Sequence, residues 1–119
     1  MLLGRRSDHE TFYPSAWDVI GGHVEGSESL SEALVREFVE EIDVKPLEFV
    51  ELASLSEPRP TVNGEAEYHI YAITRWEGVP TLRGTEHSEV RWFDVPDAVQ
   101  LELAHPGYVS LFNGLRLGL

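Results

Sequence analysis

The sequence predicts one domain of the α/β (α+β) class, in which helices pack on a mixed β-sheet. One observation is a helix signature over 30–42, where a capping motif precedes apolar residues at helical spacing. A second is that segments rich in apolar and aromatic residues, with partial alternation, lie on both sides of this helix. The order strand, helix, several strands, helix is typical of such a sheet. A chain of 119 residues is long enough for one domain with a hydrophobic core, so 1–119 are expected to form a single domain.

The expected elements are separated by turn residues. In chain order they are strand 1–6, loop 7–14, strand 17–20, helix 30–42, strand 47–56, strand 66–76, strand 90–95, a short helix at 96–98 and a last helix at 108–115. Gly21-Gly22 ends the second strand. Two prolines and the dipeptide Asn63-Gly64 lie between strands 47–56 and 66–76, and they predict that these strands form a long hairpin.

Helix 30–42 has clear signals at both ends. Ser29 and Glu32 form a capping box at its start. Asp43 lies at its C-terminal cap, where Asp tolerates a left-handed backbone less well than Gly but better than most residues. At about 100° per residue, the apolar side chains share one broad arc and the glutamates a neighbouring one. The apolar residues of this arc are Leu30, Leu34, Val35, Phe38, Val39 and Ile42. The helix is therefore expected to bury the apolar arc and to present its carboxylates.

The charge balance limits the kinds of partner. Twenty-one acidic against nine basic residues give a formal net charge of -12, which argues against binding a nucleic-acid polymer or an anionic membrane through a basic surface. The chain has no cysteine, so disulfides and thiolate chemistry are excluded. Its apolar runs are too short for a signal peptide or a membrane-spanning helix, and a cytoplasmic protein is the expectation.

Three glutamates of the predicted helix have the spacing of a metal site. Glu37, Glu40 and Glu41 are neighbours on a helix at i, i+3 and i+4. Carboxylate oxygens are hard ligands of the kind that Mg²⁺ prefers, and one to three ions would relieve the repulsion among the acids. The alternative is a solvated acidic face, which the triplet alone does not exclude. For the triplet alone the solvated face is the commoner interpretation, and only the longer pattern around it changes this.

Residues around the triplet have supporting roles in this interpretation. Arg36 lies beside the acids on another radial direction and is expected to orient a carboxylate. Glu28, at the helix start, is expected to pair with Arg36 or to bind a metal through water. Gly21 and Gly22 allow a close approach of the backbone, so a carbonyl of Gly22 is a further candidate metal ligand.

The spacing from Gly22 to Val44 resembles the Nudix box, Gly-x5-Glu-x7-Arg-Glu-U-x-Glu-Glu-x-Gly-U, in which U is apolar. Every specified position matches except Asp43, which stands where the box has a glycine. That glycine serves the turn after the helix, so the expected cost of Asp43 is strain on the order of 1 kcal/mol and not lost activity. The segments 17–25 and 86–95 resemble family members more weakly.

The resemblance implies a Nudix fold, a mixed β-sheet sandwiched between helices in an α-β-α arrangement. It implies a hydrolase that uses Mg²⁺, or Mn²⁺ as a substitute, to cleave the pyrophosphate linkage of a nucleoside diphosphate linked to a group X. A MutT-like activity on nucleoside triphosphates is one candidate, and the identity of X stays open. The alternative is a domain that senses a nucleotide without turnover. Degenerate sensors usually lose acids of the box, and this chain keeps them.

Carried over by position, the resemblance makes Glu37, Glu40 and Glu41 metal ligands, with Arg36 and Glu28 as supporting residues. The general base stays open between Glu37, Glu41 and a residue outside the box. The candidate outside the box is Glu86, six residues before Trp92, on a loop expected to face the helix. Glu89 is the second candidate in this segment.

Substrate contacts are harder to assign from the sequence. His23 and Asn113 are candidates for contacts with a phosphate and a base edge. Four aromatic residues could stack on a base, although most aromatic residues of small domains belong to the core. They are Trp17, Tyr68, Tyr71 and Phe93.

The start of the chain leads to one expectation about assembly. Family members usually carry further residues ahead of the segment that corresponds to 2–6, and these form most of an early strand. Either translation starts upstream of Met1, or a homodimer partner or another strand covers this edge of the sheet. Self-association, or reduced stability relative to a longer chain, is therefore predicted.

Overall fold

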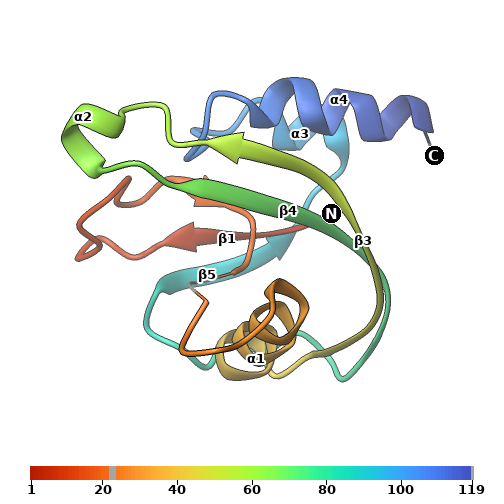
Figure 1. Cartoon of the computed structure of the whole chain (residues 1–119). Coiled ribbons are helices and arrows are strands. Elements are labelled where there is room, and N and C mark those ends of the chain that lie inside the picture. The colour runs from red at the N-terminus through yellow and green to blue at the C-terminus, as the bar shows by residue number, and fades with distance from the viewer. Residues whose placement is uncertain (22–23, 119) are drawn as a thin grey trace.

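The computed structural model describes residues 1–21 and 24–118, and the side chains among them up to Leu115 (Figure 1). In chain order the elements are β1 Leu2–Arg6, β2 Trp17–Asp18, α1 Leu30–Ile42, β3 Lys45–Ser56, α2 Pro60–Asn63, β4 Glu67–Glu77, β5 His87–Trp92, α3 Val95–Ala98 and α4 Tyr108–Gly118. No helix within these residues is long and apolar enough to cross a membrane.

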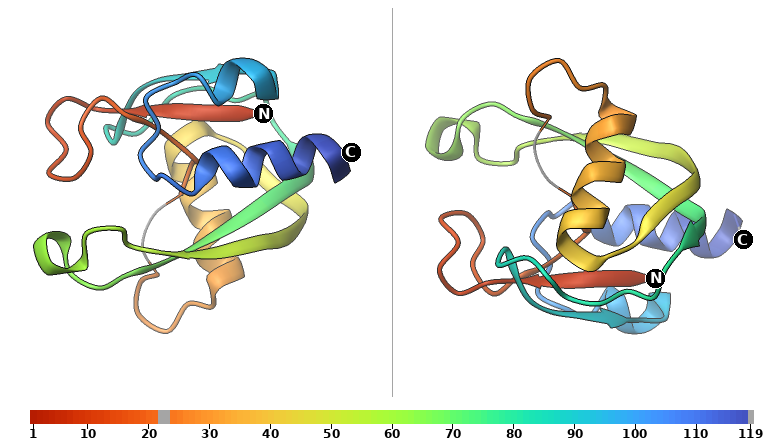
Figure 2. Two further views of the ribbon diagram at one scale, coloured as in Figure 1. Left: turned by 90° about the horizontal axis from the view of Figure 1, so that it is seen from above. Right: turned by 90° about the horizontal axis from the view of Figure 1, so that it is seen from below.

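The strands form two antiparallel groups between layers of helix. One sheet has the order β2-β1-β5, and the long strands β3 and β4 form a second, curved sheet. In Figures 1 and 2 these strands lie between α1 on one side and α3 with α4 on the other. An isolated bridge between Trp17 and Leu103 adds a parallel pairing. The predicted α+β class, with strands between helices, is confirmed.

The predicted strands are confirmed with shifted ends. β3 and β4 form the predicted hairpin, and the turn between them contains the short helix α2. The last strand begins at His87 and not at Val90, because His87 and Glu89 pair with Arg6 and Arg5 of β1. β1 is therefore an inner strand of its sheet, since β5 pairs along its length and β2 pairs at Gly4 and Arg5.

Two hydrophobic clusters hold these layers together. The larger is built on Leu3, Trp17, Ile70 and Phe112, and the smaller consists of Ile20, Ile42 and Val44. Their buried members are Leu3, Ala16, Trp17, Ile70, Ala98, Ala104, Tyr108 and Phe112 in the first, and Ile20, Ile42 and Val44 in the second. Trp17 meets Phe93 edge to face, with ring centroids 5.0 Å apart. The smaller cluster anchors α1 through Ile42.

Helix α1 has the predicted ends. The side-chain oxygen of Ser29 accepts from the Glu32 N–H, and the Glu32 carboxylate accepts from the Ser29 N–H. Asp43 is the C-terminal cap with φ 59° and ψ 35°, and its N–H donates to the carbonyls of Phe38 and Val39. This left-handed backbone is the conformation for which the family pattern has a glycine.

The predicted burial of α1 is confirmed for Ile42 and wrong for Leu30 and Val39, while the other residues of the apolar arc are half-buried. Its buried residues are Ala33, Glu37, Glu41 and Ile42, whereas Leu30 and Val39 remain 40% and 43% exposed. The periodicity of the apolar side chains reports the usual tendency of a helix to bury them. Here the interior side of the helix also carries two carboxylates, and such a departure from the hydrophobic pattern is typical of a functional site.

Replacing Asp43 by glycine should stabilise the protein by about 0.5–1 kcal/mol. A left-handed residue other than glycine is strained, and the ion pair of Asp43 with Arg83 is exposed, so its loss costs little. The free energy of unfolding in urea measures the effect. Arg83→Gln is the control for the ion pair alone. A loss of stability in Asp43→Gly beyond that of the control would contradict the strain argument.

Candidate functional site

Arg36 joins the acids of α1 into one network. Its guanidinium donates to both oxygens of Glu28, from Nε at 2.8 Å and from Nη2 at 3.0 Å. Nη1 donates to Glu37 Oε1 at 2.8 Å and to Glu40 Oε2 at 3.2 Å. The predicted pairing of Arg36 with Glu28 is therefore present, and the bidentate geometry fixes the start of the helix against its middle.

The three glutamates of the triplet lie in different surroundings. Glu37 and Glu41 are each only 6% exposed, whereas the side chain of Glu40 is 55% exposed. Glu37 and Glu40 share Arg36. Glu41 instead points to the loop before β5. A carboxylate buried there without a cation partner is costly, which makes Glu41 the most unusual of the three.

The loop 78–86 is attached to the end of α1 by backbone hydrogen bonds. The Glu41 carbonyl accepts from Arg83 N at 2.8 Å, and the Ile42 carbonyl accepts from Thr81 N at 2.8 Å. These bonds use carbonyls that the end of a helix leaves without intrahelical partners. The attachment carries Glu86, at the far end of the loop, to the carboxylate of Glu41.

Glu41, Glu86 and His87 form the tightest group of metal-binding side chains in the described part of the chain. One ligand atom from each lies within 4.8 Å of the others. His87 is 4% exposed, and its Nδ1 lies 3.6 Å from Glu41 Oε2. Neither atom has a hydrogen-bond partner among the described residues.

Electrostatics distinguish these side chains from ordinary surface groups. Burial, followed by the charges of Glu86 and Glu37, raises the pKa of Glu41 to about 7. Burial lowers the pKa of His87, so its ring is neutral at neutral pH. Two carboxylates beside a neutral imidazole, with orphaned buried atoms, are a donor set that fits a divalent cation.

Gly84 gives the loop its close approach to Glu41. A Cβ added at Gly84 would overlap the Glu41 carboxylate. Replacing Gly84 by alanine should therefore displace Glu41 or the loop and lower the stability of the protein by about 1–3 kcal/mol. The free energy of unfolding in urea measures the effect. Gly114→Ala, at an exposed position of α4 where an added Cβ meets nothing, is the control. Equal stability of the two variants would show that the contact is unimportant.

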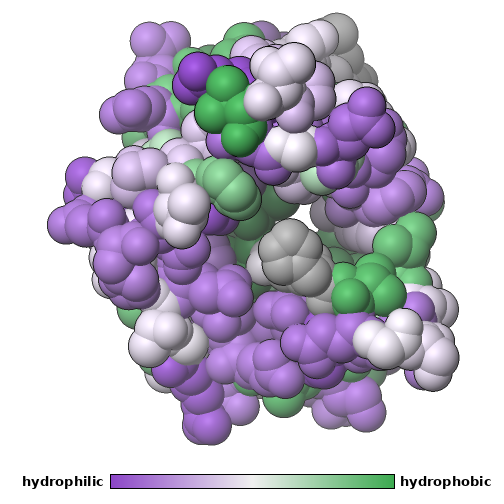
Figure 3. Space-filling model, turned by 60° about the vertical axis from the view of Figure 1, so that its left-hand side comes forward, coloured by the Kyte–Doolittle hydropathy of each residue, from purple (hydrophilic) through white to green (hydrophobic). Residues whose placement is uncertain are grey.

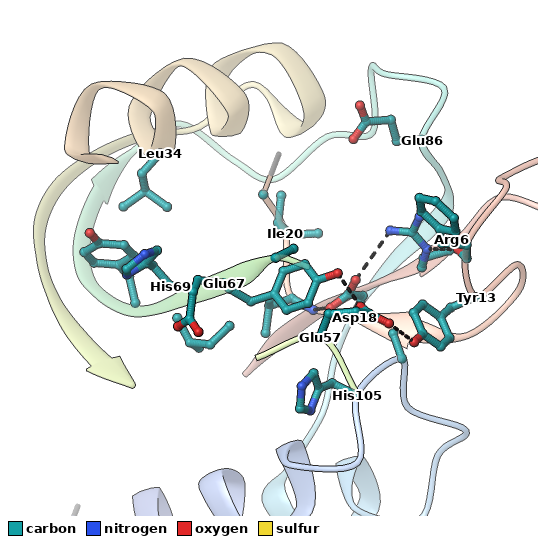
Figure 4. Close-up of a pocket in the computed structure, with 18 of the residues that line it drawn as sticks. Arg6, Tyr13, Asp18, Ile20, Leu34, Glu57, Glu67, His69, Glu86 and His105 are labelled. Atoms are coloured by element: carbon teal, nitrogen blue, oxygen red, sulfur yellow. Dashed lines mark hydrogen bonds and ion pairs between the residues drawn. The ribbon is translucent and has the colours of Figure 1, made fainter. Parts of the chain in front are cut away.

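A pocket of about 330 Å³ opens beside this group. Its wall includes Glu86 and His87 at one end, and Leu34, Tyr68 and Tyr71 from α1 and β4. In Figure 4, Glu86 lies at one side of the pocket and Leu34 and His69 at another. Figure 3 shows this hollowed face, with hydrophobic side chains inside a mainly hydrophilic rim. The pocket can hold a ring beside the acidic group.

The floor of the pocket is polar, and hydrogen bonds join its side chains. The Tyr108 hydroxyl donates to Asp18 Oδ1 at 2.6 Å, and Arg6 Nη1 lies 3.5 Å from Asp18 Oδ2. Glu57, only 4% exposed, accepts from the hydroxyls of Tyr13 and Tyr68 and from Asn63 Nδ2. This second network joins the loop 7–14 to the β3–β4 hairpin (Figure 4).

The remaining predicted residues lie in several places. Gly22 and His23 are outside the described residues, and Gly21 lines the pocket. Asn113 is exposed on α4 and is not among the described residues that line the pocket. Glu89 pairs with Arg91 on β5, so Glu86 is the residue of this segment that reaches Glu41.

The aromatic candidates divide between core and pocket. Trp17 and Phe93 belong to the core, whereas Tyr68 and Tyr71 line the pocket. Sequence reasoning missed His87, and the only signal that could have pointed to it is its position directly after Glu86. It also missed Glu57 and Asp18, whose partners are distant in the sequence.

Comparisons with known proteins agree with this geometry. The family model described as the NUDIX domain matches residues 1–113. Among curated proteins, none matches the chain. The solution structure of the E. coli ORF135 protein is 28% identical, with a TM-score of 0.75, over 98% of this chain and 79% of that one.

Two more distant structures share the fold. The MutT protein from Methanosarcina mazei Go1 has a TM-score of 0.83 at 21% identity, over 98% of this chain and 83% of that one. The NUDIX domain of Shewanella oneidensis NrtR, complexed with ADP ribose, has a TM-score of 0.76 at 23% identity, over 98% and 76%. The match of the family model over nearly the whole chain, together with a box whose acids gather beside a pocket, shows that the chain belongs to the Nudix family.

Proposed function

We propose that this protein is a metal-dependent Nudix hydrolase that cleaves the pyrophosphate linkage of a nucleoside diphosphate linked to X. A MutT-like pyrophosphohydrolase of nucleoside triphosphates is the first form of this activity to test. The observation that supports it best is the meeting of Glu41 with Glu86 at the end of a pocket large enough for a ring. Domains that sense a nucleotide without turnover usually lose acids of the box, and this chain keeps Glu37, Glu40 and Glu41.

The residues that would hold the cation are acids of α1 and of the loop before β5. Glu37, Glu40 and Glu41 would bind Mg²⁺ or Mn²⁺, with Glu86 as a ligand from the loop and a carbonyl of Gly22 as a further candidate. Bound there, the cation would screen the charge of the phosphates and lower the pKa of a coordinated water. Arg36 would keep Glu37 and Glu40 in place, because its guanidinium already donates to both.

The general base is proposed among Glu37, Glu41 and Glu86. Glu41 has the best electrostatic case, because its pKa, raised to about 7, is near the pH at which a base must accept a proton. Glu37 has a weaker case, because its Oε1 already accepts a hydrogen bond from Arg36 Nη1 at 2.8 Å. Glu86 is exposed and close to Glu41, and it would complete the site from the loop.

The pocket favours a substrate with an uncharged ring beside its phosphates. Its walls carry apolar and aromatic groups, including Tyr68, Tyr71 and Leu34. Among the described lining residues the acids Glu10, Asp18, Glu57, Glu67 and Glu86 outnumber the single arginine, Arg6. A second anionic group would be repelled there. This supports a nucleotide whose base enters the pocket and whose phosphates lie at the Glu41 end.

A panel of nucleotides tests the proposal. Nucleoside triphosphates, ADP-ribose and sugar nucleotides are incubated with the protein and Mg²⁺ or Mn²⁺, and released phosphate and pyrophosphate are measured. Turnover of at least one substrate, lost in Glu41→Gln and kept in Glu89→Gln, is the expected result. Binding of a nucleotide in a thermal-shift assay without turnover of any would instead favour the sensing domain.

A further inference from the structure

His87 is the one buried histidine in the described residues with a ring nitrogen left without a hydrogen bond. The other buried histidine, His105, is bonded at both nitrogens: Nε2 lies 2.8 Å from the Ser56 carbonyl oxygen and Nδ1 accepts from Gly107 N. A buried polar atom without a partner costs free energy, so its retention needs an explanation. The matching orphan, Glu41 Oε2, lies 3.6 Å away.

The ring of His87 is held in one orientation. A Cβ added at Gly4 of β1 would lie 2.5 Å from His87 Cδ2 and 3.0 Å from its Cγ, so the ring packs directly on the bare backbone of Gly4. Nδ1 lies on the other edge of an imidazole from Cδ2. The packing therefore directs Nδ1 towards Glu41.

The spacing of the three groups is close to that of ligands of one cation. Ligand atoms about 2.1 Å from a common cation lie about 3.0–4.2 Å from one another. The corresponding atoms of Glu41, Glu86 and His87 lie within 4.8 Å of one another. Glu86 is exposed on its loop, so a rotation of its side chain can close the difference without moving the buried pair.

We propose that Glu41, Glu86 and His87 form a mixed nitrogen and oxygen site that takes a divalent first-row transition metal in preference to Mg²⁺. An imidazole nitrogen suits transition metals, whereas Mg²⁺ prefers oxygen ligands and keeps its water. Glu41 connects this site to the carboxylates of α1. The inference deepens the proposed function, because it names the class of cation at the Glu41 end of the pocket.

Mn²⁺ without nucleotide is the probe. Electron spin-echo spectroscopy of Mn²⁺ bound to the wild-type protein should show coupling to a directly coordinated ¹⁴N nucleus, which an all-oxygen site lacks. His87→Gln should lose this coupling and bind Mn²⁺ about tenfold or more weakly, while its Mg²⁺ affinity changes less than about twofold. His69→Gln, which alters another histidine lining the pocket, is the control and should keep the coupling.

Bound Mn²⁺ without nitrogen coupling in the wild-type protein would overturn the proposal, and His87 would then be a packing residue beside an all-carboxylate site. Coupling that survives in folded His87→Gln would overturn it as well. If His87→Gln does not fold, Glu86→Gln, altered at an exposed position, should weaken Mn²⁺ binding while the Mn²⁺ that still binds keeps the nitrogen coupling, and an unchanged Mn²⁺ affinity would overturn the proposal. The Mn²⁺ measurement contains no nucleotide, so it is independent of the assay of hydrolysis. Nitrogen coupling in a protein that hydrolyses no nucleotide would support this inference and contradict the proposed function. Hydrolysis by a protein without nitrogen coupling would support the proposed function and contradict this inference.

Discussion

Replacing Glu41 by glutamine should abolish hydrolysis and, in the metal-free protein, raise the stability. The loss of turnover is expected to be on the order of 10³-fold, because the change removes a proposed metal ligand and a candidate general base together. Glutamine has nearly the same shape, so the pocket and the contacts of α1 with the loop 78–86 should remain.

The gain in stability follows from the sign of the pKa shift. The pKa of Glu41 rises from 4.5 to about 7 on folding, because burial and the charges of Glu86 and Glu37 disfavour the carboxylate. Below about pH 4.5 the group is protonated in both states and costs nothing. Between pH 4.5 and pH 7 the Glu41 carboxyl loses its proton in the unfolded chain but keeps it in the folded protein. Folding therefore becomes less favourable as the pH rises through this range. Above pH 7 the cost is complete, at about 2–3 kcal/mol, and glutamine removes it.

Urea unfolding at pH 5 and pH 8, with a chelator present, measures this effect. Glu41→Gln should exceed the wild type by about 2 kcal/mol at pH 8, with little difference below pH 5. Added Mn²⁺ should reverse the order by stabilising the wild type alone. Glu89→Gln, at a half-buried position of β5 whose carboxylate pairs with Arg91, should change neither activity nor stability by much. If Glu41→Gln is inactive and also less stable than the wild type at pH 8, Glu41 stabilises the fold and its buried carboxylate does not destabilise it.

Replacing Glu57 by glutamine should destabilise the protein by about 2–3 kcal/mol at neutral pH. Burial by itself raises the pKa of this carboxyl, but hydrogen bonds from Asn63, Tyr13 and Tyr68 reverse the effect and lower the pKa to about 2. A pKa about 2.5 units below its ordinary value corresponds to about 3 kcal/mol of stability. Glutamine has nearly the same volume, but its neutral amide accepts hydrogen bonds more weakly than the charged carboxylate does.

The contribution of Glu57 should have its own pH signature. It is complete above about pH 4.5, where the unfolded chain is ionised, and it disappears as the pH falls towards 2, where the folded carboxyl is protonated. The difference in unfolding free energy between wild type and Glu57→Gln should therefore shrink over this window. Glu65→Gln, at an exposed position of the same hairpin, is the control. A difference that stays constant from pH 7 to pH 3 would assign the effect to packing and not to the charge.

Local patterns in the chain determined much of the fold. The ends of α1 were predictable because the capping box and the residue at the C-terminal cap act within a few residues of the helix. The β3–β4 hairpin was predictable because its turn residues restrict the backbone locally. The box from Gly22 to Val44 also indicated the family, because its spacing is a property of one continuous segment.

Tertiary structure decided what the helix buries and which groups meet. The apolar arc of α1 predicted the burial of Ile42 but missed that Glu37 and Glu41 are buried while Leu30 and Val39 are exposed. The position of His87 beside Glu41 depends on two things that no local pattern encodes. One is the attachment of the loop 78–86 to the end of α1, and the other is the pairing of β5 with β1.

The sequence by itself therefore determined the identity of the acids, since their spacing on one helix is a local property of the chain. Only the tertiary structure decided that Glu41 lies with Glu86 and His87 while Glu40 stays exposed, and that Glu57 and Asp18 form the floor of the pocket. The physical reason is that desolvation and charge pairing act through space. They depend on contacts between residues far apart in the chain, which periodicity along one element does not contain.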